Sequence, residues 1–276
     1  MDTGASHIDA TVDLPRAGFW RRWFATLIDS ILVMLPFQAL AAVLFVVTAG
    51  MVQMDSGFFR VCTPTETIPQ SLDPPPPHDS NYAGVCRISF FGATTGAILT
   101  VGRVTREGST TRTVSQGYML DKDGKPIHGT SIDGIVWLAL LAYLVGAIWK
   151  TGRTLGARVA RVRVIDTTEP GVPGVRLHKA IIRYLAMAIG FVPVFAVLIS
   201  RTAVAGGADA MFNEDFFGWF TYAAGLGLLW TVVLIFQVSM KKDPVYDRVA
   251  GTAVVREDYS VEQQDLANKT RLSRVP

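Results

Sequence analysis

Asp29 is the residue whose chemistry most needs an explanation, because it lies inside an apolar segment. The segment is WRRWFATLIDSILVMLPFQALAAVLFVVTAG, residues 20–50. Arg22 precedes Asp29 by seven residues, so on a helix the two share a face and lie about 10 Å apart. Ala25 and Thr26 lie between them on that face. A stripe of small and polar groups suits contact with another helix better than contact with lipid.

An unpaired carboxylate at this depth of a bilayer costs at least a few kcal/mol. Asp29 is therefore expected to be protonated, to face water, or to pair with a cation. Arg183, in IIRYLAMAIG, is the strongest candidate for that cation. Two roles stay open for Asp29: an ion or proton site, or a polar lock between helices.

The composition indicates a membrane protein. Of the 276 residues, 50% are hydrophobic and only 18% are charged, whereas soluble domains carry about 25% charged residues. Crossing a bilayer takes roughly 20 mostly apolar residues. Four windows approach or exceed that length: residues 23–48, 132–149, 180–200 and 216–239. The N-terminus lacks the basic start and short apolar core of a signal peptide, so the first window is expected to remain as a span.

Lysine and arginine predict the orientation of these spans. Basic residues gather before the first window, between the second and third, and after the fourth. The loop between the third and fourth windows has only Arg201 against three acidic residues. Both termini are therefore predicted to be cytoplasmic, and the long first loop extracytoplasmic.

The first loop, residues 51–131, has a composition of its own. A proline-rich stretch, SLDPPPPHDS, is followed by short apolar or alternating runs and by the turn-like DKDGKP. This pattern predicts a β-rich insertion, although FFGATTGAILTVG is also compatible with a re-entrant helix. Both cysteines of the chain, Cys62 and Cys86, lie here. An extracytoplasmic location favours a disulfide between them over two free thiols.

The predicted fold is thus an all-α membrane protein with four transmembrane helices and a β-rich extracytoplasmic insertion between the first and second. Its parts are described by the following ranges: a polar cytoplasmic N-terminus at 1–19, the first transmembrane helix at 20–50, the insertion at 51–131, the remaining helices and cytoplasmic loop at 132–256, and a disordered cytoplasmic tail at 257–276.

Four segments of this sequence resemble the RDD family of bacterial membrane proteins, which is named for one arginine and two aspartates. They are, in family order, GFWRRWFATLID, TLGARVARVRVID, LHKAIIRYL and DPVYDRVAGTAVV. Arg22 and Asp29 match the family's arginine and first aspartate, and Arg183 matches a recurring arginine. Asp247 matches the second aspartate. The long first loop departs from the family pattern.

The resemblance implies an integral membrane protein of the bacterial inner membrane, for which transport is commonly suggested. Asp247 is expected near the cytoplasmic surface, where it pairs with Arg22 or Arg153. Asp243 precedes a proline that ends the fourth helix. The predicted functional polar cluster is Arg22, Asp29, Arg183 and Asp247, with Arg153, Thr26 and Asp243 in secondary positions. RVRVIDTTEPGVPGVRL is expected to form a short hairpin or amphipathic strand.

The sequence has no phosphate-binding glycine loop, no nucleophile elbow and no clustered metal ligands. We therefore expect no enzymatic activity, no cofactor, no metal site and no nucleic-acid partner. The leading hypothesis is a transporter or transport-associated component for an unknown ligand. The alternatives are a cation/proton antiporter that uses Asp29, and a membrane scaffold or sensor whose insertion binds a partner. The expected partners are the lipid bilayer, the ligand or cation, and further copies of the chain.

Overall fold

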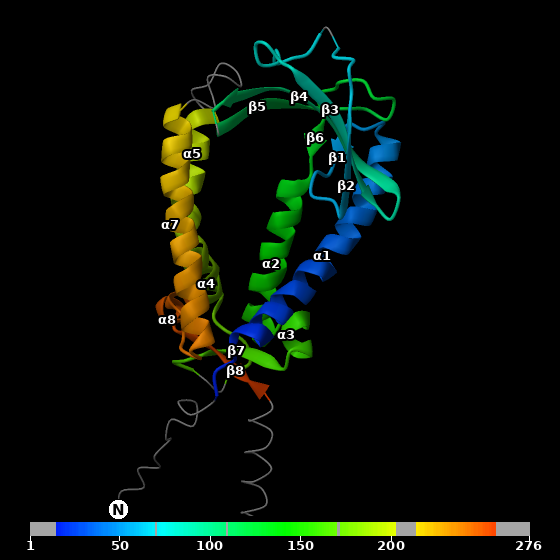
Figure 1. Cartoon of the computed structure of the whole chain (residues 1–276). Coiled ribbons are helices and arrows are strands. Elements are labelled where there is room, and N and C mark those ends of the chain that lie inside the picture. The colour runs from blue at the N-terminus through cyan, green and yellow to red at the C-terminus, as the bar shows by residue number, and fades with distance from the viewer. Residues whose placement is uncertain (1–14, 70, 109, 170–171, 203–213, 258–276) are drawn as a thin grey trace, which may run out of the picture. The chain divides into compact units, whose positions relative to one another are not determined.

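A computed structural model describes residues 15–69, 71–108, 110–169, 172–202 and 214–257 (Figure 1). Four helical stretches are long and apolar enough to cross a membrane: Phe19–Val47, Asp133–Thr151, Leu177–Ser200 and Phe216–Ser239. Each coincides with one predicted window. Most of the predicted polar N-terminus and of the predicted disordered tail lies outside the described residues.

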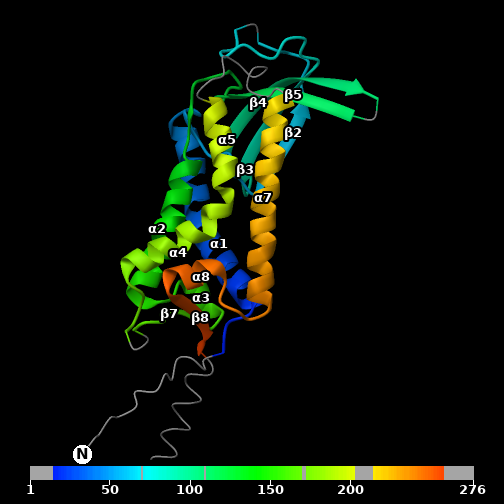
Figure 2. The same cartoon turned by 90° about the vertical axis from the view of Figure 1, so that its left-hand side faces the viewer.

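Figures 1 and 2 show the order of the elements. The helices are α1 (Phe19–Val47), α2 (Asp133–Thr151), α3 (Leu155–Val159), α4 (Leu177–Ala188), α5 (Val192–Thr202), α7 (Glu214–Ser239) and α8 (Val245–Ala250), and a 3₁₀ turn, Ile189–Phe191, joins α4 to α5. The strands are β1 (Val52–Gln53), β2 (Phe59–Pro64), β3 (Tyr82–Phe90), β4 (Ala93–Glu107), β5 (Thr110–Met119), β6 (Thr130–Ser131), β7 (Val162–Asp166) and β8 (Thr252–Arg256).

An all-α description therefore fits the apolar helices but not the whole chain. The insertion is β-rich, as predicted, and contains β1 to β6. The chain also has a second β region outside the insertion, where β7 pairs antiparallel with β8.

The described residues form two compact units, and α1 contributes to both. The second unit, within residues 32–139 and 193–225, contains the insertion. Its main sheet has the order β2-β3-β4-β5, and β1 pairs with β6. Phe45 of α1 joins Leu99, Val101 and Tyr118 in one apolar core. FFGATTGAILTVG forms a turn followed by β4, so the re-entrant helix is wrong.

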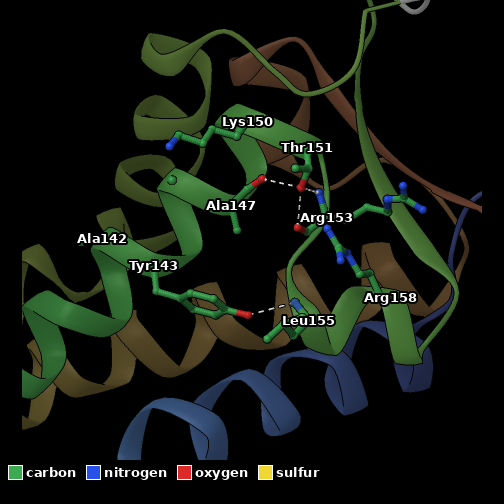
Figure 3. Close-up of a pocket in the computed structure, with 9 residues that line it drawn as sticks. Ala142, Tyr143, Ala147, Lys150, Thr151, Arg153, Leu155 and Arg158 are labelled. Atoms are coloured by element: carbon green, nitrogen blue, oxygen red, sulfur yellow. Dashed lines mark hydrogen bonds between the residues drawn. The ribbon is translucent and has the colours of Figure 1, made fainter.

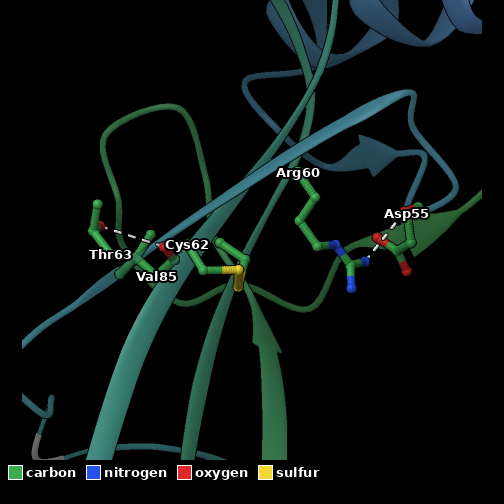
Figure 4. The surroundings of a disulfide bond; sticks show 6 residues. Asp55, Arg60, Cys62, Thr63 and Val85 are labelled. Carbon is green, nitrogen blue, oxygen red and sulfur yellow. Dashed lines mark hydrogen bonds between the residues drawn. A yellow bond between two sulfur atoms is a disulfide. The ribbon is translucent and has the colours of Figure 1, made fainter.

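The predicted disulfide is present in this sheet (Figure 4). Cys62 on β2 and Cys86 on β3 lie directly opposite each other in the antiparallel register. The bond therefore joins neighbouring strands and fixes the edge strand β2, all of whose residues are exposed, to the rest of the sheet.

The first unit, within residues 1–31, 140–192 and 226–276, surrounds a small apolar core. Ala25 of α1, Ile148 of α2, Ala157 of α3 and Ala180 of α4 belong to it, together with Val164 of β7 and Val254 of β8. Of the two forms expected for RVRVIDTTEPGVPGVRL, the strand is present as β7, and no hairpin occurs among the described residues of this segment. β7 pairs instead with β8 at the end of the described chain, with Val164 opposite Val254.

Candidate functional site

Asp247 is the centre of a buried ion cluster in the first unit. It lies on α8, a single short helix that begins after Pro244 and is followed by Gly251. Gly251 has a left-handed backbone with φ 63°, which glycine adopts at the C-terminal end of a helix without a steric penalty. The helix turns Asp247 inward, and none of its surface is exposed (0%).

Three side chains donate to the Asp247 carboxylate. Arg22 Nη1 lies 2.8 Å from Oδ2, and Thr252 Oγ1 lies 3.0 Å from Oδ1. Arg183 Nη1 forms an ion pair with Oδ1. The cluster therefore joins α1, α4, α8 and β8, so it holds distant parts of the chain together as well as concentrating charge.

The two arginines differ in how fully their donors are used. Arg22 Nε also donates to the Ala17 carbonyl at 3.0 Å, but its Nη2 is buried with no hydrogen-bond partner among the described residues. Arg183 donates from Nη1 to Thr252 Oγ1 at 3.3 Å, and its guanidinium carbon lies 5.0 Å from the Tyr246 ring centre. Both guanidinium groups thus keep N–H donors for a further acceptor.

Asp29 is not paired with Arg183, and the expected salt bridge between them is wrong. The Asp29 side chain, 2% exposed, accepts three hydrogen bonds from uncharged groups. Tyr143 Oη and the Gly156 N–H donate to Oδ1 at 2.9 and 2.7 Å, and Thr154 Oγ1 donates to Oδ2 at 2.5 Å. No cation forms an ion pair with Asp29 within the described ranges. Neutral donors can solvate a buried carboxylate in place of water, which removes the need for a cation.

Thr154 explains why these donors gather at Asp29. Its hydroxyl also accepts from the Ala157 N–H at 3.0 Å, so it caps the start of α3. Gly156 allows that turn to touch α1, since a Cβ at this position would lie 2.0 Å from the Ala25 carbonyl oxygen.

A cavity of about 220 Å³ lies beside Asp29, within the first unit. Arg22, Arg183 and Asp29 all line it, and Asp247, which does not line it, is bonded to the two arginines. Two positive and two negative side chains make the whole group formally neutral. The remaining lining is polar at some positions and apolar at others: Thr26, Thr154, Tyr184 and Tyr246, with Ala25, Leu144, Ile148, Ala157, Val162, Val164, Met187 and Val254.

The secondary positions have other partners. Arg153 pairs with Glu257 at 2.6 Å, so it is not the expected partner of Asp247. Asp243 pairs with Arg16 at 3.0 Å near the surface. Thr26 donates to the Arg22 carbonyl in its own helix and lines the cavity. Cys62 and Cys86 belong to the other unit and take no part in this site.

A second cavity, of about 370 Å³, lies between α2 and α3 (Figure 3). Lys150, Arg153 and Arg158 line it. Tyr143 also lines it, and its hydroxyl accepts from the Leu155 N–H at 2.9 Å while donating to Asp29. Exposed cations at the end of an apolar helix are usual at a headgroup boundary. This cavity contains none of the four cluster residues.

The neutral partners of Asp29 leave no direct signal in the sequence. Tyr143, Thr154 and Gly156 carry no charge, and 114 to 127 positions separate them from Asp29. One indirect hint is Thr154, which stands directly before LGAR and is of a residue type that often caps the start of a helix. No group of three His, Cys, Asp or Glu side chains that could hold a metal ion occurs in the part of the chain that the structure describes.

Comparison with known proteins adds no relative. No family model, no curated protein and no solved structure matches this chain.

Proposed function

We propose that this chain is a transporter, or a transport-associated component, that binds a small ligand in the cavity beside Asp29. The observation that carries the proposal is a cavity, lined by buried charged groups, in a unit that contains parts of the apolar helices. Ionisable side chains in such helices mark ligand or ion pathways by default. The resemblance to the RDD family supports the same class.

The dimensions and donors of the cavity limit the ligand. Pockets for drug-sized molecules measure about 300–1,000 Å³, so a cavity of about 220 Å³ suits a small ion or solute. The unpartnered Arg22 Nη2 and the remaining Arg183 donors favour an oxygen-rich ligand. Guanidinium groups bind carboxylate, sulfate or phosphate oxygens well because their N–H donors form a planar fork.

Anion binding tests this proposal directly. The unfolding temperature of the purified protein should rise with sulfate or phosphate relative to chloride at equal ionic strength, because a ligand that binds only the folded state stabilises it. Leu144→Phe, which fills part of the cavity, should remove the rise. Leu141→Phe is the matched control, since Leu141 is 43% exposed on the same helix and does not line the cavity. An equal rise in all three proteins would contradict the proposal.

A cation/proton antiporter is the second candidate, and it is favoured by the absence of any cation paired with Asp29 within the described ranges. In vesicles carrying an internal pH dye, a sodium or potassium pulse should then change the internal pH. Asp29→Asn should abolish that change, since the amide cannot exchange a proton. An Asn oxygen in place of Oδ1 keeps the Tyr143 and Gly156 bonds, so folding is expected to survive.

The cellular setting belongs to the same proposal. We place the chain in a bacterial inner membrane with both termini cytoplasmic and residues 51–131 outside. The asymmetry of lysine and arginine in the short loops supports this orientation. A four-helix protomer offers little room for a complete translocation path, which favours a homo-oligomer. A scaffold or sensor role for the insertion is the remaining alternative.

A further inference from the structure

One end of the insertion's four-stranded sheet carries an exposed aromatic cluster. Phe58 precedes β2 and Phe59 begins it, while Phe90 ends β3 and Phe91 lies in the turn to β4. Ring centres of Phe58 and Phe90 lie 6.1 Å apart, and those of Phe90 and Phe91 lie 4.8 Å apart. Phe58, Phe59 and Phe91 are 50%, 55% and 79% exposed. We call these four residues the aromatic tip.

The residues around the aromatic tip suit a membrane surface. The turn sequence SFFGATTG has no charged residue. Two exposed arginines lie next to the tip. In the β2–β3 register, Arg60 is one position and Arg87 is two positions beyond the Phe59–Ser89 pair. Figure 4 shows Arg60 reaching toward the Asp55 carbonyl, at 3.3 Å. Apolar rings flanked by arginines match the acyl boundary and the phosphate layer of a bilayer.

Two contacts within the second unit fix the depth of this tip. Asp133, the first residue of α2, accepts from the Asp55 and Ser56 N–H groups at 2.7 and 3.1 Å. Gln38 of α1, which is fully buried, donates to the Ser56 carbonyl. Gln38 precedes the last residue of α1 by nine positions, which is about 14 Å along the helix axis. The chain at Ser56 therefore lies beside the apolar helices and not beyond their ends.

The length of α2 and the contact between Asp133 and Ser56 together indicate the depth of Ser56 in the bilayer. Its 19 residues span about 28 Å, barely the thickness of a hydrocarbon core of about 30 Å. Asp133 must then lie at the headgroup boundary, and Ser56 lies with it. Phe58 follows Ser56 by two residues, a distance of at most about 7 Å. The ring contacts keep Phe90 and Phe91 at the same level.

We infer that the aromatic tip inserts into the boundary between headgroups and acyl chains on the side of the membrane where residues 51–131 lie. The lipid surface covers rings that would otherwise form an exposed apolar patch, which soluble surfaces rarely keep without a partner. The insertion is thereby anchored through its sheet as well as through α1 and α2. This inference rests on the four apolar helices as spans and does not depend on the ligand proposed above.

Spin labels in lipid nanodiscs test the inference. Cys62 and Cys86 are bonded to each other, so a single introduced cysteine is the only reactive thiol expected. Phe91→Cys places a label on the tip. Thr111→Cys is the control, because Thr111 pairs with Arg106 at the far end of β4, thirteen residues and at most about 44 Å from Ala93. The measured quantity is the ratio of the collision rate with oxygen to that with a water-soluble nickel chelate. This ratio should be several-fold higher for the Phe91 label than for the Thr111 label.

Each other result overturns the inference. Equal chelate access at both labels would place the tip in water. Low access to both oxygen and the chelate at Phe91 would mean that protein covers the tip. Phe59→Cys supplies a second label from β2, and it should give the same result if Phe91→Cys fails to fold.

Discussion

At the residue scale, Asp247 binds both buried arginines: its expected pair with Arg22 is present, and it also pairs with Arg183, the cation that was expected beside Asp29. The sequence suggested Arg183 as the partner of Asp29, because a charged side chain can be recognised in a sequence as a partner for a carboxylate and a neutral donor cannot. In the structure, both arginines donate to the Asp247 carboxylate, and three neutral groups donate to the Asp29 carboxylate. A backbone N–H and a hydroxyl satisfy a carboxylate as well as a cation does, and neither leaves a charge pattern in the sequence.

Asp247 should be the most sensitive residue of the cluster. Asp247→Asn leaves Arg22 and Arg183 buried without a carboxylate, and breaking one side of a buried ion pair costs about 3–5 kcal/mol. Adding Arg183→Met should recover part of the loss by removing one uncompensated charge. Thermal unfolding in a mild detergent measures both effects.

Asp243→Asn is the matched control for that experiment. Asp243 is four positions away and also pairs with an arginine, but about a fifth of each side chain in the pair is exposed. Partly exposed ion pairs contribute about 0–1 kcal/mol. Equal losses in Asp247→Asn and Asp243→Asn would disprove the central role of Asp247.

Asp166 should make stability depend on pH. Burial alone would raise the pKa of this carboxyl group, but hydrogen bonds from Lys179 and Thr168 outweigh it and lower the pKa from 3.8 to about 2. A pKa that is lower in the folded than in the unfolded chain stabilises the protein above pH about 4. That stabilisation is lost as the pH falls toward about 2. The unfolding temperatures of the native protein and of Asp166→Asn should therefore converge as the pH falls from about 4 to about 2. A difference that stays constant over this pH range would contradict the role of Asp166.

At the element scale, the apolar helices were predictable and the β7–β8 pairing was not. A long apolar run is a local signal, so all four windows coincide with helices. Strand pairing between β7 and β8 joins residues about 90 positions apart, Val162 with Arg256 and Asp166 with Thr252. Alternation in the sequence indicates a strand but not its partner. The nearest turn signal, TTEPGVPG, therefore suggested a local hairpin, whereas β7 pairs with β8.

The contact between α1 and α3 should depend on a single glycine. A Cβ at Gly156 would lie 2.0 Å from the Ala25 carbonyl oxygen and 2.9 Å from Asp29 Cγ, so Gly156→Ala must push the two helices apart. Overpacking of this kind costs about 1–3 kcal/mol. Gly146→Ala is the control, because nothing lies within 4 Å of its added Cβ. The unfolding temperature should fall for Gly156→Ala alone, and a fall of equal size for Gly146→Ala would contradict the close contact.

At the scale of the whole molecule, the sequence predicted the number of apolar helices and the β-rich character of residues 51–131. Both follow from composition over long stretches. The two compact units did not follow from it, because each one combines segments from distant parts of the chain. Their boundaries fall inside four apolar helices, α1, α2, α5 and α7, where the hydropathy pattern shows no break.

Orientation in the membrane is the last prediction, and it concerns the chain as a whole. Four crossings place both termini and the loop between the second and third helices on one side, opposite residues 51–131. With Cys62 and Cys86 joined, a single new cysteine can report each side. Asp123→Cys, on the exposed turn of the insertion, should react with a membrane-impermeant maleimide in intact cells. Glu169→Cys, exposed in the loop before α4, should react only after the membrane is opened. The reverse pattern would invert the topology, and labelling of both in intact cells would mean that the number of crossings between them is even.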